Sequence, residues 1–390
     1  MARAVDARAA RLRVIRRRRA VAATIVAVLI AGVVLLAGEV FGSPSRGGAR
    51  AHGRRATTLP RSVGVAARRF GPGLLRGSDP SVLPGPVLIA DRDNNRLLEV
   101  SPTGRVLWRF PGPNGAAGGL SFRLPDDAFF SADGRELVVT QEDDFVISIV
   151  DVATRRIVYR YGHPGVPGSG RNYLHNPDDA LLSPSGLLWS ADIKNCRLVV
   201  IRPPAHRVIH QFGETGACGH QRGRSYGSPN GAFPMIGGGT VVSEINGDWI
   251  DLLTPGGRAV GSTHPPGFTY PSDTNEISPG TFLSVDYTSP GAIETFTAGG
   301  RLLWRYAPRG RRVLDHPSLA LPLPNGDFLA NDDRNQRVIV VDPGTDRIVW
   351  QYGHTGHAGS APGYLSNPDG VDLAPPYSLT RRFAATLRAP

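Results

Sequence analysis

The sequence predicts an all-β protein, a six-bladed β-propeller of four-stranded antiparallel blades. The first observation is internal repetition: residues 161–179 (YGHPGVPGSGRNYLHNPDD) and 352–370 (YGHTGHAGSAPGYLSNPDG) are identical at 11 of 19 positions, at an offset of 191 residues. The second is a phrase that begins with proline followed by polar residues and recurs six times, at Pro125, Pro177, Pro229, Pro271, Pro317 and Pro368. The intervals between these prolines are 42–52 residues, which is the length of one four-stranded blade.

Two further phrases supply the remaining strands of each blade. Asp-x-x-Asn-x-Arg occurs at 91–96, 192–197 and 332–337, each time between two short apolar runs. Short β-rich runs that end at such turn formers are typical of tight hairpins. A small turn followed by an apolar-aromatic run then recurs as GRVLWRF, RRIVYRYG, GRLLWRYA and DRIVWQYG. Together with the proline-marked strand, these phrases predict four strands per unit.

The two ends of the repeat region indicate how the ring closes. Residues 86–110 contain three strand patterns and no leading proline phrase, whereas residues 367–375 contain one strand pattern and nothing after it. We therefore expect the C-terminal strand to complete the N-terminal blade, which leaves no open sheet edge. The propeller is predicted over residues 79–376, followed by a C-terminal tail at 377–390. A β-sandwich with coincidental self-similarity is the structural alternative.

The N-terminal region predicts a membrane anchor. Residues 20–38 are nineteen residues without a charge, long enough to cross a hydrocarbon core of about 30 Å as a helix. Eight arginines lie in the basic tail 1–19 and four in the twenty residues after the apolar run. This bias predicts a single-pass protein of the cell membrane with a cytoplasmic tail and the propeller on the extracytoplasmic side. A cleaved signal peptide that ends near Val40-Phe41-Gly42 is the alternative to the anchor. Residues 39–78 are predicted to form a flexible basic linker.

The charge distribution excludes nucleic acid as the expected partner. The net charge of +11 suggests a nucleic-acid binder at first, but residues 1–78 carry 16 arginines and only two acids. Residues 79–376 carry 25 basic and 31 acidic residues. The predicted propeller is therefore mildly acidic, and the chain has neither zinc-ligand spacing nor a recognition-helix pattern.

The only two cysteines are predicted to form a disulfide. Cys196 lies in the second Asp-x-x-Asn-x-Arg turn, and Cys218 lies in the long loop after the fourth strand of the same blade. Both connections emerge on one face of an antiparallel blade, and exported compartments permit the bond. A pair of metal-binding or reactive thiols is the alternative, but no ligand spacing supports it.

The loop-rich face of the ring is the predicted binding face. The long loops bring histidines there, and the proline phrases bring aspartates and asparagines toward the central channel, where polar groups that converge in a concave mouth favour a ligand. Asp and Asn beside Pro or Gly are also ordinary turn formers. No resident cofactor is expected apart from Ca²⁺, for which the channel is a candidate site. The predicted ligand-binding residues are Asp127, His163, His175, Asp179, Asn230, Asp273, Asn275, His354 and Asp369.

The repeated phrases resemble those of NHL repeats and related six-bladed propellers. The resemblance covers about three quarters of the chain, the part after the linker, and it implies a fold and a binding role without implying a chemistry. The segment DPGTDRIVWQYG at 342–353 also resembles the strand signature of quinone-dependent dehydrogenases. Those enzymes have larger rings, and their cofactor residues have no counterpart here.

One histidine resembles a catalytic residue of another propeller family. The stretch HPSLALPLPNGDFL at 316–329 is similar to the arylsulfotransferase propellers, which implies that His316 is a transient sulfate acceptor. Pro317 stands where that family usually has His or Asp. The sequence thus predicts a binding module for a protein, glycan or small ligand. The alternative is a propeller enzyme, either arylsulfotransferase-like or a metal-dependent lactonase or lyase.

Overall fold

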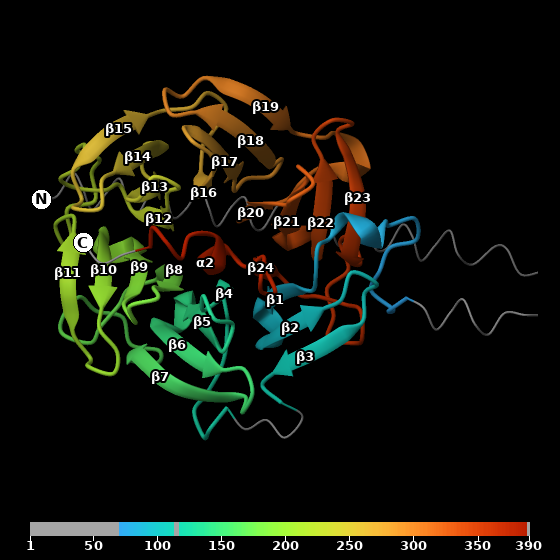
Figure 1. Ribbon diagram of the computed structural model, residues 1–390, viewed down its shortest axis with the longest axis horizontal. Coiled ribbons are helices and arrows are strands. Elements are labelled where there is room, and N and C mark those ends of the chain that lie inside the picture. The colour runs from blue at the N-terminus through green and yellow to red at the C-terminus, as the bar shows by residue number, and fades with distance from the viewer. Residues whose placement is uncertain (1–69, 113–116, 388–390) are drawn as a thin grey trace, which may run out of the picture. The chain divides into compact units, whose positions relative to one another are not determined.

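Six four-stranded antiparallel sheets surround a central axis in the computed structural model, which describes residues 70–112 and 117–387 (Figure 1). The predicted six-bladed propeller is confirmed. Four of the six innermost strands begin at the proline of a proline phrase: they start at Pro177, Pro229, Pro271 and Pro368. The six innermost strands are β24 (Pro368–Leu373), β4 (Ala128–Phe130), β8 (Pro177–Leu182), β12 (Pro229–Pro234), β16 (Pro271–Ser278) and β20 (Ala320–Pro322).

The other strands follow outward in chain order within each blade. The second strands are β1 (Val87–Asp91), β5 (Glu136–Gln141), β9 (Leu188–Asp192), β13 (Thr240–Glu244), β17 (Thr281–Asp286) and β21 (Phe328–Asp332). The third are β2 (Arg96–Val100), β6 (Val146–Asp151), β10 (Arg197–Ile201), β14 (Trp249–Leu253), β18 (Ala292–Thr297) and β22 (Arg337–Asp342). The outermost are β3 (Val106–Phe110), β7 (Arg156–Gly162), β11 (Val208–Phe212), β15 (Ala259–Thr263), β19 (Leu302–Tyr306) and β23 (Arg347–Gly353).

The ring closes as the sequence predicts. Strand β24 pairs antiparallel with β1 in the register Ile89↔Val371 and completes the sheet β24-β1-β2-β3. Because the last strand of the propeller enters the first blade, every innermost strand of the described residues is paired within a four-stranded sheet.

Short 3₁₀ turns join the second and third strands of four blades. They are η3 (Arg92–Asn94), η4 (Glu142–Asp144), η5 (Ile193–Asn195) and η7 (Asp333–Asn335). Each of these turns ends in a residue in the left-handed region, for example Asn95 at φ 52° and Cys196 at φ 57°. The Asp-x-x-Asn-x-Arg phrase therefore encodes a tight hairpin turn, as its composition indicates.

The predicted disulfide is confirmed. Cys196 and Cys218 are bonded, with their Cα atoms 5.1 Å apart and 22 residues of separation in sequence. The bond ties the long loop after β11 to the turn between β9 and β10.

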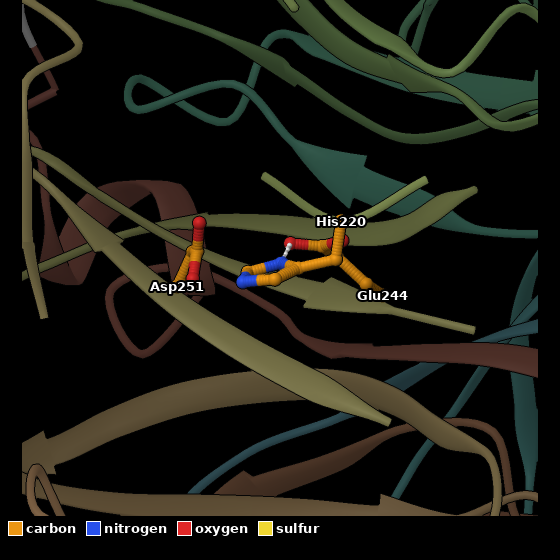
Figure 2. A group of neighbouring side chains, drawn as sticks. All are labelled: His220, Glu244 and Asp251. Atoms are coloured by element: carbon orange, nitrogen blue, oxygen red, sulfur yellow. Dashed lines mark hydrogen bonds and ion pairs between the residues drawn. The ribbon is translucent and has the colours of Figure 1, made fainter. Parts of the chain in front are cut away.

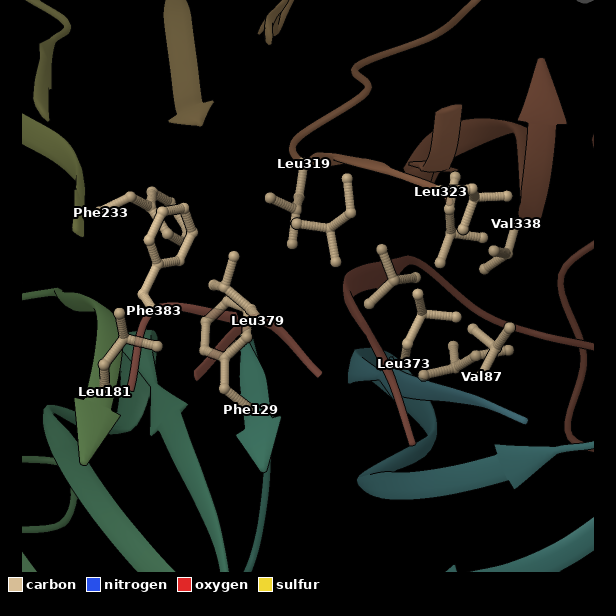
Figure 3. Packing of buried hydrophobic residues seen from close by; sticks show 14 of the residues in the cluster. Val87, Phe129, Leu181, Phe233, Leu319, Leu323, Val338, Leu373, Leu379 and Phe383 are labelled. Atoms are coloured by element: carbon tan, nitrogen blue, oxygen red, sulfur yellow. The ribbon is translucent and has the colours of Figure 1, made fainter. Parts of the chain in front are cut away.

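Residues after β24 pack into the ring. Helix α2 (Leu379–Arg382) lies at its centre in Figure 1. Leu379 and Phe383 are buried, and Figure 3 shows them among apolar side chains from several innermost strands. Both side chains belong to a hydrophobic cluster that includes Phe129, Leu181, Phe233 and Leu319.

The segment just before the propeller also packs against it. Leu75 N donates to Gln351 O, and Asp79 N donates to Val349 O, so this end of the predicted linker runs beside β23. A 3₁₀ turn, η2 (Pro80–Val82), then leads into the first blade, and η6 (Gly310–Arg312) precedes β20.

The predicted membrane anchor at 20–38, the basic tail 1–19 and most of the linker lie outside the described residues. Within residues 70–112 and 117–387, no helix is long and apolar enough to cross a membrane.

Candidate functional site

A polar cavity of about 290 Å³, which we call the axial pocket, opens where the innermost strands begin. Its lining includes seven carboxylates and two guanidinium groups, an excess of five negative charges if all are ionised. The lining residues are Arg92, Asp126, Asp127, Glu142, Asp143, Asp178, Asn230, Tyr270, Ser272, Asp273, Tyr287, Ser318, Arg334, Asn367 and Asp369.

Two repeated features of the chain build this pocket. The starts of the innermost strands contribute residues such as Asp178, Asn230 and Asp273. The turns after the second strands contribute residues such as Arg92 and Arg334. Because both features recur in successive blades, the fold directs polar side chains from all six blades to one end of the axis.

Arg92 neutralises the carboxylates of one side of the pocket. Its guanidinium forms ion pairs with Asp126, with Asp369 at 3.0 Å and with Asp143 at 2.5 Å. Burial alone would lower the pKa of Arg92, but the surrounding carboxylates outweigh it and raise that pKa. Glu142 lies 3.5 Å from the same guanidinium, yet burial and repulsion from Asp178 raise the pKa of its carboxyl to about 7. Arg92 is therefore a fixed counter-ion with little remaining capacity to bind a ligand.

A second group of carboxyls has no basic partner among the described residues. Asp127, Asp179 and Asp273 come from three different blades, and their donor oxygens lie within 4.8 Å of one another. All three are buried, and in each the Oδ1 atom has no hydrogen-bond partner within residues 70–112 and 117–387. Burial, with repulsion among the neighbouring carboxylates, raises all three pKa values well above the usual range. We call these residues the inner aspartates.

Asp178 links the inner aspartates to the rest of the pocket. It lines the pocket and forms a second close trio with Asp126 and Asp127. Burial raises the pKa of Asp178 to about 6, against opposing hydrogen bonds from Asp127 and the backbone of Asp179. Carboxylates packed this closely must share protons or a cation. Several carboxylate oxygens at one point are the ligands that Ca²⁺ and Mg²⁺ prefer.

Gly231 permits two of the inner aspartates to approach each other. A Cβ atom at this position would lie 3.1 Å from Asp179 Oδ2, 3.1 Å from Asp273 Oδ1 and 2.5 Å from Ser243 Oγ. A side chain would therefore displace the carboxylates of two blades, so glycine here is a requirement of the close approach.

The channel residues predicted from the sequence occupy this region. Asp127, Asn230, Asp273 and Asp369 line the axial pocket. Asp179 does not line it, but its carboxylate lies within 4.8 Å of those of Asp127 and Asp273, which do.

Asn275 is buried deeper along β16. Its amide donates to Ala320 O across the blade boundary. It does not line the axial pocket.

The predicted loop histidines lie outside the axial pocket. His163 packs on Tyr173 of its own loop at 4.1 Å between ring centroids, and His354 packs in the same way on Tyr364, also at 4.1 Å. His175 contacts the ring of Phe145 edge-on. The paired geometry in the two copies of the duplicated segment gives these rings a packing role in their loops.

His316 lies next to the pocket without lining it. Its ring packs edge-on against Tyr287, a lining residue, with 4.9 Å between centroids. Nδ1 of His316 is 2.6 Å from Asp315 Oδ1.

Several lining residues were missed by the sequence reasoning. Arg92, Glu142, Asp143, Tyr287 and Arg334 all stand at the first or second position after the last residue of a second strand. These are the two variable positions of the Asp-x-x-Asn-x-Arg turn and of its counterparts in other blades. Their shared place in the repeat is the signal that would have identified them.

Comparisons with known proteins establish the architecture. No family model and no curated protein matches the chain. A structure of a protein of unknown function from Bacteroides caccae is similar at 14% identity with a TM-score of 0.50, covering 74% of this chain and 98% of that one. A nidogen/laminin complex structure is similar at 13% identity and a TM-score of 0.50, with the same coverage. A streptogramin B lyase structure is more distant, at 15% identity and a TM-score of 0.45, covering 63% and 72%.

The two structures with a TM-score of 0.50 support the propeller fold. At such low identity they carry no activity over to this chain. The resemblance to NHL repeats stays a prediction.

Proposed function

We propose that this chain is an exported, membrane-anchored β-propeller that binds a protein, glycan or small ligand at the axial pocket through a Ca²⁺ ion held by the inner aspartates. The observation that carries the proposal is the set of unpaired, buried Oδ1 atoms of Asp127, Asp179 and Asp273. Uncompensated buried carboxylates are strongly unfavourable, and a divalent cation would compensate all three at once.

The pocket lining supports a ligand that offers oxygen atoms. Ca²⁺ takes six to eight oxygen ligands, more than three aspartates provide, so hydroxyl or carboxylate groups of a ligand can complete its shell. Tyr270 and Tyr287 present partly exposed rings at the pocket, and such rings pack against sugar or apolar surfaces. Arg334 is exposed at the same mouth and is suited to an anionic group.

Export and anchoring rest on the sequence. The uncharged run at 20–38 and its arginine bias support a membrane anchor. The Cys196–Cys218 disulfide is in keeping with an oxidising compartment.

An enzyme is the second candidate, and one observation favours it. Asp315 lies within hydrogen-bond distance of His316 Nδ1 and would hold the ring with Nε2 free, which is the arrangement of an activated histidine. Transfer of sulfate from an arylsulfate to a phenol by the purified protein, and its loss in His316→Ala, would support this candidate. Absence of transfer by the unaltered protein would reject it.

The primary proposal is tested by calorimetric titration of the metal-stripped full chain with Ca²⁺. We expect one Ca²⁺ to bind, and Asp273→Asn to weaken it by at least about 10-fold because a ligand charge is lost at a buried site. Asp133→Asn, which changes an exposed acid on the opposite face, should leave the affinity unchanged. Equal affinity in Asp273→Asn and Asp133→Asn would refute the Ca²⁺ site.

The binding role is tested separately by pull-down. Full-length protein in Ca²⁺ should recover a glycan or protein from an extracellular extract, and Asp273→Asn should not. Recovery that is the same in Ca²⁺ and in EDTA would contradict a cation-dependent binding function.

A further inference from the structure

A second group of metal-ligating side chains lies in the fourth blade, away from the axial pocket. His220, Glu244 and Asp251 each offer one donor atom, and these atoms lie within 4.8 Å of one another. Figure 2 shows the imidazole of His220 between the two carboxylates. None of the three lines the axial pocket.

The sheet of this blade positions the two carboxylates. Glu244 ends β13 and Asp251 lies in β14, and the register Val242↔Asp251 and Glu244↔Trp249 places both acids on one face. Ser262 of β15 lies opposite Asp251 in the strand register, so its side chain is on the same face of the sheet. His220 comes from the long loop 213–228, and its ring stacks on Trp249 at 4.2 Å with an interplanar angle of 7°. The histidine is therefore held over the carboxylates by an aromatic contact.

Asp251 is the observation that points to a ligand. Its side chain is fully buried, and neither of its oxygens has a hydrogen-bond partner among the described residues. No Arg, Lys or His nitrogen of those residues forms an ion pair with it. Burial of a carboxylate without a partner costs several kcal/mol, so the fold retains a strongly unfavourable group directed at a histidine and a second acid.

His220 and Glu244 lie close enough together to bind one ion after a small shift. His220 Nδ1 is 2.9 Å from Glu244 Oε1, at hydrogen-bond distance. Two donors that each lie about 2.0–2.2 Å from a tetrahedral Zn²⁺ are roughly 3.3–3.6 Å apart, so a shift of about half an ångström would let both bind one ion. His220 Nε2 is 3.2 Å from Ser262 Oγ, a partner of the kind that fixes the tautomer of a metal-binding histidine. The backbone amide of Gly227 donates to the other oxygen of Glu244 and orients that carboxylate.

We propose that His220, Glu244 and Asp251 form a binding site for a transition-metal ion, Zn²⁺ in the first instance. An imidazole with two carboxylates suits Zn²⁺ better than Ca²⁺ or Mg²⁺, which prefer oxygen ligands alone. Three protein ligands leave the fourth position of Zn²⁺ for a water or for a group of a ligand. The small exposure of the His220 side chain, 14%, gives the ion a path from solvent.

The site also explains how the loop 213–228 is held. The disulfide at Cys218 ties this loop to the third blade, and His220, two residues later, would tie it to the fourth blade through the metal. The ion would thus join two neighbouring blades at the loop-rich face. Arg222 and Arg224 are exposed in the same loop, so trypsin can report on its order.

The test uses the full chain, stripped with EDTA and returned to excess Ca²⁺ so that the axial pocket does not compete. We expect the protein to bind one Zn²⁺ and Asp251→Asn to weaken binding about 100-fold or more. A residue that binds the metal directly contributes at least as much to affinity as a residue that only hydrogen-bonds to a ligand, whose loss costs roughly 10–100-fold. Zn²⁺ should also slow trypsin cleavage after Arg222 and Arg224 in the unaltered protein and have no effect on that rate in Asp251→Asn.

The matched control is His264→Gln. His264 packs edge-on against the same Trp249 but is exposed and outside the cluster, so this variant should keep the unaltered Zn²⁺ affinity. Folding of Asp251→Asn is checked by its thermal midpoint without metal, which should equal or exceed that of the parent because a buried charge has been removed. The proposal would be overturned if the parent bound none of Zn²⁺, Mn²⁺ and Co²⁺. Equal Zn²⁺ affinity in the parent and in Asp251→Asn would also overturn it.

Discussion

Asp372 shows how one carboxyl can connect three elements of this ring. It lies on β24 and is fully buried. Its oxygens accept hydrogen bonds from the backbone amides of Phe130, Leu373 and Leu379, which belong to β4, β24 and α2. Burial raises the pKa of Asp372 to about 7, although the three amide bonds act in the opposite direction. Its protonation state is therefore sensitive to pH in the physiological range.

This raised pKa predicts a pH dependence of stability that one substitution removes. Between about pH 4 and pH 7 the folded protein holds a proton on Asp372 that the unfolded chain has lost, so the contribution to stability falls as pH rises through 7. At about 1.4 kcal/mol per pKa unit, the free energy of unfolding of the parent relative to Asp372→Asn should fall by roughly 2–3 kcal/mol from pH 5 to pH 8. Urea unfolding of both proteins at the two pH values measures this difference, and a difference that does not change with pH would contradict the assignment.

At the scale of elements, hydrogen bonds join each repeated turn to a repeated long loop. In the third blade, Arg197 Nε bonds Asp192 at 2.8 Å, and its Nη1 reaches Ser169 O at 3.3 Å in the long loop. Asn195 of the same turn donates to Gly168 O. In the first blade, Arg96 likewise reaches Ser360 O and Tyr364 O. The duplicated segment recurs because each copy is fastened to such a turn.

Loss of the arginine should release the loop and destabilise the blade. Arg197→Ala leaves the fully buried Asp192 without its counter-ion, so we expect a loss of about 3–5 kcal/mol in the free energy of unfolding. Residues 162–176 should also become more sensitive to proteolysis. Arg207→Ala, at an exposed arginine of the same blade, is the control for urea unfolding. A loss in Arg197→Ala no larger than in the control would show that the turn does not fasten the loop.

The pocket residues that could be predicted from the sequence are those that recur in the repeats, and the ones that were missed stand at positions that vary between repeats. The aspartates of the proline phrases were predicted at the channel because the phrases recur where the innermost strand of each unit begins. Arg92 and Arg334 were not, because repetition identifies the residues that build the turn, and these two occupy the positions that the turn leaves free. The proximity of Asp251 to His220 could not be predicted either, since it depends on strand register and on the conformation of a long loop.

At the scale of the whole ring, the two ends of the channel differ. One end opens into the acidic axial pocket, and at the other end α2 and the residues after it cover the apolar side chains of the innermost strands. No structure was predicted for this C-terminal segment, because it follows the last repeat and has no internal copy to compare with. Its apolar residues, Leu379, Phe383 and Leu387, are spaced four residues apart and are the pattern that would have indicated a buried face.

The apolar end should contribute to stability without affecting the pocket. Phe383 is 2% exposed and packs near Phe129, Leu181 and Phe233, which come from three different blades (Figure 3). Phe383→Ala should therefore lower the free energy of unfolding by about 3–5 kcal/mol, while Ca²⁺ affinity at the opposite end stays within about two-fold of the parent because additivity holds for distant sites. Arg381→Ala, at an exposed neighbour, is the control. If Phe383→Ala were no less stable than Arg381→Ala in urea, the segment after β24 would not stabilise the ring, and the six blades would depend on their own interfaces alone.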